Sequence, residues 1–351
     1  MRDLDNRAAY SQIDASDYLR FLRQFPEECR RAWEKGLAFP LPESYRGLSR
    51  VVIAGMGASA VGGDLAHDLA AQEGGAPIFV HRDYGLPPLL DRRTLFIASS
   101  YSGETEETLS AFAEALKTPA KKLALTTGGK LGPMARSHRV PVLDIDYKSP
   151  PRAALAHSFI PLLAVLQRLG LVADQSRAVE EMMANLVALS EEVSERVPLS
   201  SNPAKELAVA LRGRIAVVYG AGFISQVARR WKTQLNENGK SWAFFEVFPE
   251  LDHNAIEGYH LPDGAPVSVV LLRSPSLPSP ILRRYQATAE LLSRAGVPHR
   301  MVEARGESLL AQMMSLIVIG DYVSYYLAIL NGVDPSPVDN VAYLKERLSR
   351  G

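Results

Sequence analysis

The feature that most constrains the fold is a unit of strand, glycine turn and helix that occurs twice in the chain. The first copy has a β-branched run at Arg50–Ala54, a turn that contains Gly55 and Gly57, and helical spacing of apolar residues through Ala71. The second copy begins at Arg214, about 165 positions later, and has the same three parts. A duplicated unit of this kind predicts two similar α/β domains in one chain.

Strands and helices alternate after each of these units. The first copy continues with predicted strands at 78–82, 94–98, 122–127 and 140–145, and the second with predicted strands at 242–248, 267–273 and 300–303. Alternation of this kind gives a parallel sheet with helices on both faces, and ligands bind beyond the carboxyl ends of its strands. The predicted fold class is therefore α/β, with two tandem domains that are each a doubly wound parallel sheet flanked by helices.

Helices outside the two sheets define the remaining boundaries. Helical spacing at 14–36 ends before Pro40, and a glutamate-rich helix at 174–197 precedes the Ser-Ser-Asn-Pro run at 200–203. We therefore predict five segments. They are an N-terminal helical cap at 1–45, a first domain at 46–172, a helical linker at 173–205, a second domain at 206–333, and a C-terminal helix at 334–351 that carries Lys345.

Composition limits the kinds of partner. Lys plus Arg equals Asp plus Glu at 39 each, so no basic excess predicts binding to nucleic acid or to an anionic membrane. The apolar segment Met314–Leu330 is interrupted by Asp321 and is shorter than the ~20 residues that span a bilayer, which predicts a buried helix. The single cysteine, Cys29, cannot form an internal disulfide, and residues 1–5 lack the apolar run of a signal peptide, so we expect a cytoplasmic protein. The histidines are scattered along the chain, and no metal site is predicted.

Three hydroxyl groups lie in the loop between the strand at 94–98 and the next helix. Ser100, Ser102 and Thr105 surround Gly103, at a point where the first helical turn leaves backbone N–H groups without partners. The helix dipole adds partial positive charge there, so hydroxyls and amides together suit a phosphate monoester. A capping box explains one of these hydroxyls but not three. The loop is therefore predicted to bind phosphate.

The turn after the first strand offers a second set of donors, with Gly57 and then Ser59 at the start of its helix. A dinucleotide site is the alternative, because Gly55, Gly57 and Gly62 approach a Gly-x-Gly-x-x-Gly pattern and Asp83 could contact a ribose. The third glycine falls two positions late for that pattern, so no nicotinamide cofactor is predicted. In the second copy, prolines replace the N–H donors of the corresponding loop, which assigns the phosphate to the first copy.

Four short runs carry a family resemblance. The run Ser-Tyr-Ser-Gly-Glu-Thr-Glu-Glu-Thr at 100–108 resembles the signature of sugar isomerase (SIS) domains, which bind phosphosugars in that loop. The later runs are Leu-Asn-Glu-Asn at 235–238, Pro-Glu-Leu-Asp-His-Asn at 249–254, and Pro-Ser-Pro-Val at 335–338 with Lys345 after it. Separately, the first of these later runs is typical of a helix C-cap and the second of a turn. Together they resemble the bifunctional phosphoglucose/phosphomannose isomerase family, whose members pair two SIS domains in one chain and usually work as dimers.

The resemblance implies an aldose–ketose isomerase that interconverts glucose 6-phosphate or mannose 6-phosphate with fructose 6-phosphate through a cis-enediol. The family's base corresponds to Glu237, since one carboxylate can carry the proton between C2 and C1. His253 corresponds to the imidazole that assists ring opening, and Lys345 to a lysine at the same step. Arg152 corresponds to the group that stabilises the enediolate. The implied phosphate contacts are Gly57, Ser59, Ser100, Ser102 and Thr105, with no metal, no cofactor, and no partner except the sugar phosphate and a second copy of the chain.

Two positions depart from the family pattern, and two roles have a plainer alternative. Ala58 stands where the family commonly has glycine, and Ser336 where it commonly has threonine. Arg152 in a first helical turn and Lys345 in the predicted helix at 341–350 are also typical of solvated side chains. A sugar-phosphate sensor built from SIS domains is the main alternative function, and it would not need the acid–base residues. An aminosugar-phosphate isomerase or deaminase is another, but the chain has no glutaminase segment and no N-terminal cysteine.

Overall fold

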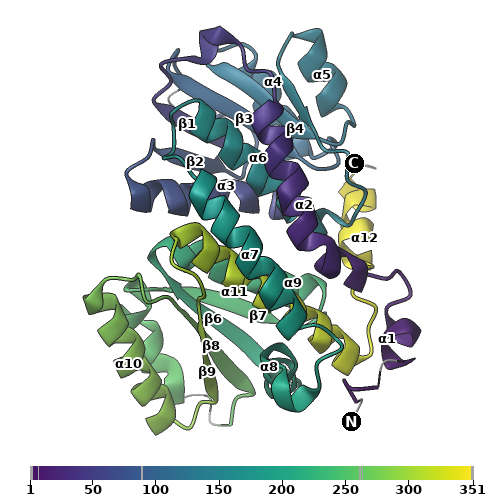
Figure 1. Ribbon diagram of the computed structural model, residues 1–351, viewed down its shortest axis with the longest axis vertical. Helices are drawn as coiled ribbons and strands as arrows, with labels where there is room; N and C mark the ends of the chain where they lie inside the picture. The colour runs from purple at the N-terminus through teal and green to yellow at the C-terminus, as the bar shows by residue number, and fades with distance from the viewer. Residues whose placement is uncertain (1–2, 7, 88–89, 261, 263, 349–351) are drawn as a thin grey trace.

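Two parallel sheets dominate the computed structural model, which describes residues 3–6, 8–87, 90–260, 262 and 264–348. In Figure 1 the first sheet lies in the upper half of the molecule and the second in the lower half, with long helices between them. The α/β class and the two tandem sheets predicted from the sequence are confirmed.

The first sheet has five strands in the order β2-β1-β3-β4-β5, and every neighbouring pair is parallel. Its strands are β1 (Arg50–Ala54), β2 (Ile78–His81), β3 (Thr94–Ser100), β4 (Lys121–Thr126) and β5 (Val142–Asp144). Every residue of β3 is buried, as expected of a central strand that helices cover on both faces. The carboxyl ends of β1 and β3 lie side by side, because Ala54 is in register with Ala98.

The second sheet repeats this topology with four parallel strands. They are β6 (Ile215–Ala221), β7 (Ala243–Phe248), β8 (Val267–Arg273) and β9 (His299–Glu303). Their order, β7-β6-β8-β9, matches the order β2-β1-β3-β4 of the first sheet. The duplication expected from the two glycine turns is therefore present in the strand order, and β7 forms one edge of the second sheet.

Helices follow the strands in the predicted alternation, with ends that differ from the predictions by a few residues. Those of the first half are α1 (Ala8–Ile13), α2 (Leu19–Ala38), α3 (Gly57–Glu73), α4 (Glu106–Ala115), α5 (Leu131–Ser137) and α6 (Leu155–Arg168). Those of the second half are α7 (Ser176–Glu192), α8 (Pro203–Leu211), α9 (Ser225–Glu237), α10 (Ser279–Arg294), α11 (Leu309–Asn331) and α12 (Asp339–Leu348).

Two helix starts were not expected from the sequence. Helix α2 begins at Leu19 instead of Asp14, because the Asp14 carboxylate accepts the backbone N–H groups of Tyr18 at 2.7 Å and Leu19 at 3.0 Å. The Asn-Pro pair at 202–203 starts helix α8, since the Asn202 side chain accepts two N–H groups of the first turn at 3.0 Å each. The predicted division at 205/206 falls inside α8 and stays a prediction.

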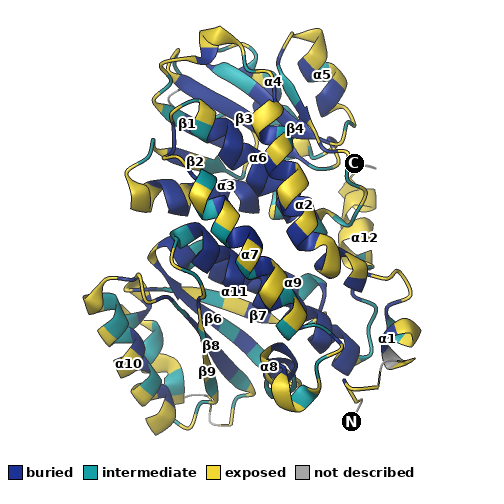
Figure 2. Ribbon diagram, in the orientation of Figure 1, coloured by how far each residue is buried: buried dark blue, intermediate teal, exposed yellow. Residues whose placement is uncertain are grey.

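Helix α11 forms the centre of the molecule. It is 23 residues long and is apolar enough to span a membrane by length and composition, but the protein itself surrounds it, and Leu310–Leu330 are all buried. Figure 2 shows its dark blue ribbon between the two sheets. Trp231 packs so tightly on it that a Cβ at Gly320 would lie 2.4 Å from the indole ring. The buried helix predicted at 314–330 is confirmed.

Candidate active site

The predicted phosphate loop follows β3 in a tight turn. The Ser100 hydroxyl accepts the Gly103 N–H at 3.1 Å and lies 2.9 Å from the Thr105 hydroxyl. Gly103 has φ of +68°, and a Cβ there would lie 2.1 Å from the Gly128 carbonyl oxygen, so the turn requires glycine. Thr105 occupies the N-cap position of α4 without a side-chain cap bond, and its hydroxyl faces Ser100 instead. The capping alternative is therefore wrong for Thr105.

The turn after β1 is joined to this loop by two hydrogen bonds. The Ser59 hydroxyl accepts the Tyr101 N–H, and the Ser99 hydroxyl donates to the Ser59 carbonyl, both at 3.0 Å. Gly57 is exposed at φ +49°, and a Cβ there would meet no atom within 4 Å. The exposed Ser102 hydroxyl accepts the N–H of its second neighbour at 3.2 Å. The predicted phosphate residues thus lie at two adjoining strand–helix junctions, β1–α3 and β3–α4, at the carboxyl ends of strands of the first sheet.

Arg152 lies in the short turn before α6 and is 2% exposed. Its Nε donates to Asn238 Oδ1 at 2.6 Å, and its Nη2 donates to the carbonyls of Pro335 and, at 2.9 Å, Ser336. The guanidinium also lies over the Tyr18 ring, 5.3 Å from its centroid. The alternative of a solvated side chain is therefore wrong, because the Arg152 guanidinium is buried. Its hydrogen-bond acceptors belong to segments that are distant in the sequence.

Glu237 is the last residue of α9 and faces Arg152 across the junction of the two domains. Its Oε2 lies 3.6 Å from Arg152 Nη1, and its side chain remains 36% exposed. Tyr101, in the predicted phosphate loop, binds the segment that precedes Arg152, because its hydroxyl donates to the Tyr147 carbonyl at 2.7 Å and accepts the Ser149 N–H at 2.8 Å. The predicted phosphate loop is thus hydrogen-bonded to the segment that leads to Arg152, whose guanidinium faces the accessible Glu237 carboxylate.

A buried polar network on helices α9 and α11 contacts Arg152. The Asp321 carboxylate accepts from Arg230 at 2.7 Å and from the Gln234 amide at 3.0 Å. Arg230 also donates to the Arg152 carbonyl at 3.3 Å, and the Asn238 amide donates to the Ser324 hydroxyl at 3.0 Å. Burial raises the pKa of Asp321, and the Arg230 guanidinium opposes that rise. The sequence signal for this network was the lone carboxylate in an apolar helix.

His253 lies far from Glu237 in the same chain. Glu237 ends the helix that returns to the amino ends of β6 and β7, whereas His253 follows the carboxyl end of β7 and is exposed. The 6 residues of β7 separate the two positions, a distance of about 20 Å. The structure therefore does not bring these two predicted residues together within one chain.

The two lysines near the C-terminal run differ in their surroundings. Lys345 lies on α12, where no residue is buried. Lys240, which the sequence reasoning missed, donates to the carbonyls of Glu237 and Pro337 and, at 3.2 Å, to that of Pro335. Its position directly after the Asn-Glu-Asn-Gly run was the available signal. Desolvation and the nearby Arg152 charge lower the pKa of Lys240.

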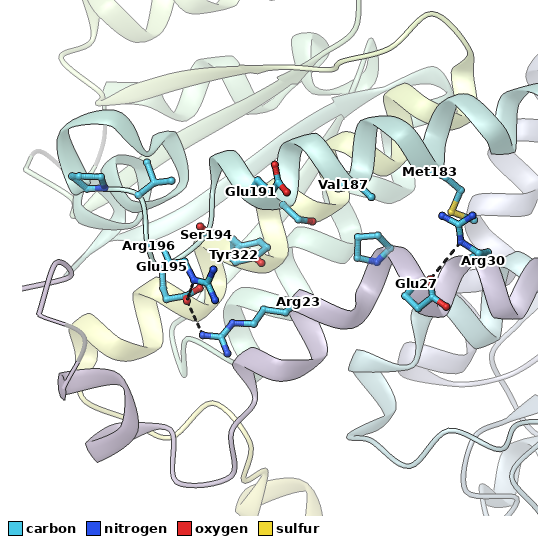
Figure 3. Close-up of a pocket in the computed structure, with 14 residues that line it drawn as sticks. Arg23, Glu27, Arg30, Met183, Val187, Glu191, Ser194, Glu195, Arg196 and Tyr322 are labelled. Carbon is cyan, nitrogen blue, oxygen red and sulfur yellow. Dashed lines mark hydrogen bonds and ion pairs between the residues drawn. The ribbon is translucent and has the colours of Figure 1, made fainter.

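A separate cavity of about 750 Å³ lies between α2 and α7, as Figure 3 shows. At one end Arg23 pairs with Glu195 at 2.7 Å. Among the described residues, no predicted site residue lines this cavity. Across all residues that the structure describes, no group of three or more His, Cys, Asp or Glu side chains could hold a metal ion.

Three comparisons place the chain among known proteins. Residues 200–348 match the model of the bacterial phospho-glucose isomerase C-terminal SIS domain. The bifunctional phosphoglucose/phosphomannose isomerase of Caldicellulosiruptor bescii is 40% identical over 327 residues, which cover 92% of this chain and 96% of that protein. The protein of the same name from Aquifex aeolicus is 35% identical over 303 residues, covering 86% and 90%.

The fold has counterparts among solved structures. A glucose-6-phosphate isomerase like protein from Thermus thermophilus matches with a TM-score of 0.67 and 21% identity over 99% of both chains. At that identity the likeness shows the fold alone, whereas the two curated relatives exceed 30% identity over most of the sequence. The chain therefore belongs to the bifunctional phosphoglucose/phosphomannose isomerase family.

Proposed function

We propose that this protein interconverts glucose 6-phosphate and mannose 6-phosphate with fructose 6-phosphate. The observation that carries the proposal is the accessible Glu237 carboxylate beside the buried Arg152, with Oε2 and Nη1 3.6 Å apart. The names of the two relatives support the same substrates. The proposal includes a cytoplasmic location and a place in the interconversion of glycolytic and gluconeogenic hexose phosphates.

The two loops of the first domain anchor the phosphate. Hydroxyls of Ser59, Ser100, Ser102 and Thr105 stand beside the first turns of α3 and α4, where free N–H groups and the helix dipoles favour an anion. An anchored phosphate leaves the other end of an open-chain sugar directed towards the second domain. C1 and C2 then reach the Glu237 carboxylate.

Glu237 moves the proton. Its carboxylate takes the C2 proton of the aldose, and the C2–H electrons form the C1–C2 double bond while the C1=O π electrons move to O1, which gives an enediolate. The charge that develops on the enediolate oxygens lies near the Arg152 guanidinium, whose fixed position requires no reorganisation during the step. The O2 hydroxyl passes its proton to O1, and Glu237 then returns the first proton to C1 while O2 becomes the ketone oxygen. One carboxylate acts as base and then as acid.

We infer that the working form is a homodimer. The length of β7, about 20 Å for its 6 residues, separates His253 from the Glu237 of its own chain, so an imidazole that opens the sugar ring would serve the site of a second copy. Exposed apolar side chains support such an association. They are Trp242 (74%) and Phe244 (47%) by the β7 edge, and Val341 (46%), Leu344 (57%) and Leu348 (60%) on α12.

The test is glucose 6-phosphate formation from fructose 6-phosphate, followed through a coupled dehydrogenase with EDTA present. Mannose 6-phosphate is the second substrate. We expect wild-type turnover that falls by at least about a hundredfold in Glu237→Gln. Glu34→Gln, an exposed glutamate on α2, is the matched control and keeps its activity. If the folded wild type binds both sugar phosphates and turns over neither, the protein is a sensor and the proposal is wrong.

A further inference from the structure

The segment at 335–337 presents three consecutive backbone carbonyls to the two cations of the candidate site. Arg152 Nη2 donates to the Pro335 carbonyl and, at 2.9 Å, to the Ser336 carbonyl. Lys240 Nζ donates to the Pro335 carbonyl at 3.2 Å and to the Pro337 carbonyl. The two prolines have no N–H, so this segment offers the site mainly acceptors. Its contacts with the site therefore depend on cationic donors.

Lys240 also holds the end of the helix that carries Glu237. Its third ammonium bond goes to the Glu237 carbonyl, so one side chain joins the end of α9 to the C-terminal segment. The residue has φ of +50°, a left-handed conformation in which glycine and asparagine are more common than lysine. The backbone conformation therefore does not explain a lysine here, whereas the three carbonyl bonds do.

Helix α12 follows this segment and contributes no residue to the core. None of its residues is buried, and Figure 2 shows it exposed along its length. A helix without buried side chains gains little positional stability from packing. The placement of Lys345 within one chain thus depends on how the segment before α12 is anchored.

We propose that Lys240 is a positioning residue, whose ammonium anchors the segment at 335–337 beside Glu237 and thereby places α12 and Lys345 for ring opening. The proposal rests on the isomerase function for the role of Lys345. The anchoring itself is independent of that function. Arg152 is the second anchor, but it also faces the reacting atoms, so Lys240 is the residue at which anchoring can be tested alone.

The test compares Lys240→Asn with Lys240→Arg. Asparagine tolerates the left-handed conformation and lacks the ammonium, whereas arginine keeps a cation that can reach the carbonyls. Lys232→Gln, a lysine elsewhere on α9, is the control. Hydrogen–deuterium exchange of peptides that cover 334–348 should be faster in Lys240→Asn, while Lys240→Arg and the control exchange as the wild type does.

Kinetics separate anchoring from a direct or merely structural role. We expect Lys240→Asn to lower kcat for fructose 6-phosphate by about tenfold to a hundredfold with little change in KM, and Lys240→Arg to recover most of the loss. The double variant Lys240→Asn/Lys345→Ala should be no slower than Lys345→Ala alone. Unchanged exchange at 334–348, or losses that multiply in the double variant, would overturn the proposal. If the wild type lacks isomerase activity, the proposed function fails separately, and the exchange experiment still decides the anchoring.

Discussion

The buried ion pair between Arg230 and Asp321 allows a quantitative prediction. Their side chains lie 2.7 Å apart and are 2% and 8% exposed. Replacing Asp321 by leucine keeps the branched shape and the number of heavy atoms but leaves the Arg230 charge buried without its counter-ion. Removing one partner of a buried pair costs about 3–5 kcal/mol of unfolding free energy. We therefore expect Asp321→Leu to be destabilised by that amount, which is a large part of the roughly 5–15 kcal/mol that stabilises most domains.

The contacts of Arg230 indicate why the structure cannot absorb this change. Its Nε has no hydrogen-bond partner among the described residues. Without Asp321, the guanidinium retains the bond from Nη2 to the Arg152 carbonyl at 3.3 Å. The double variant Arg230→Met/Asp321→Leu removes the unpaired charge. It still leaves the Gln234 amide and the Arg152 carbonyl without partners, at about 1 kcal/mol each. The double variant should therefore be destabilised by about 2 kcal/mol, less than Asp321→Leu alone.

Urea unfolding measures these differences. The fluorescence of the three tryptophans includes that of the buried Trp231, whose indole N–H donates to the Leu316 carbonyl of α11 at 2.8 Å, and circular dichroism gives an independent transition. Glu303→Gln, which breaks a pair whose side chains are 36% and 50% exposed, is the control and should cost less than about 1 kcal/mol. A loss below about 1 kcal/mol in Asp321→Leu, or a double variant less stable than the single one, would refute the reasoning.

Three further predictions concern pH, the phosphate turn and the first glycine turn. Burial raises the pKa of Asp68 to about 7 from 3.8, so its protonation stabilises the folded protein at low pH, and up to about 4 kcal/mol is lost as the pH rises from 4 through 7. Asp68→Asn should flatten this dependence in melting temperatures measured from pH 5 to pH 8, and parallel curves for both proteins would contradict it. Gly103→Ala places a Cβ 2.1 Å from the Gly128 carbonyl oxygen and should weaken fructose 6-phosphate binding at least about tenfold by calorimetry, so unchanged affinity would argue against a phosphate turn. Ser59→Ala should raise KM about fivefold with little change in kcat, and a fall in kcat alone would exclude phosphate binding as its role.

Residue patterns that are local in the sequence were sufficient to predict much of the fold. The strands β1 and β8 begin and end where the sequence predicts, because each is a continuous apolar run bounded by polar or turn residues. The duplicated sheet also follows from the sequence, since a repeated strand, glycine turn and helix can bury its faces in the same way twice. Helix α8 was missed because Asn-Pro serves equally as a linker and as a helix start.

The grouping of hydroxyls in the turn after β3 was predictable for a related reason. Ser100, Gly103 and Thr105 lie within one turn, so their mutual geometry depends on the neighbouring backbone and on local hydrogen bonds. Each family motif likewise consists of neighbouring residues in a short run. In both cases the relevant groups are close in the sequence.

Other features depended on contacts between distant segments. Arg152 could be solvated or buried as far as its own neighbours indicate, and the decision comes from Asn238 and Ser336, which are 86 and 184 positions away. Glu237 and His253 are near in the sequence, but β7 runs between them. Glu237 therefore lies towards the amino end of β7, and His253 lies beyond its carboxyl end. Lys240 acquires its three carbonyl partners only when the C-terminal segment returns to α9. The sequence by itself thus determined the two sheets and the hydroxyl-lined turn after β3, through local periodicity and turn chemistry. The tertiary structure decided which charged groups lie together, because that depends on where the chain returns.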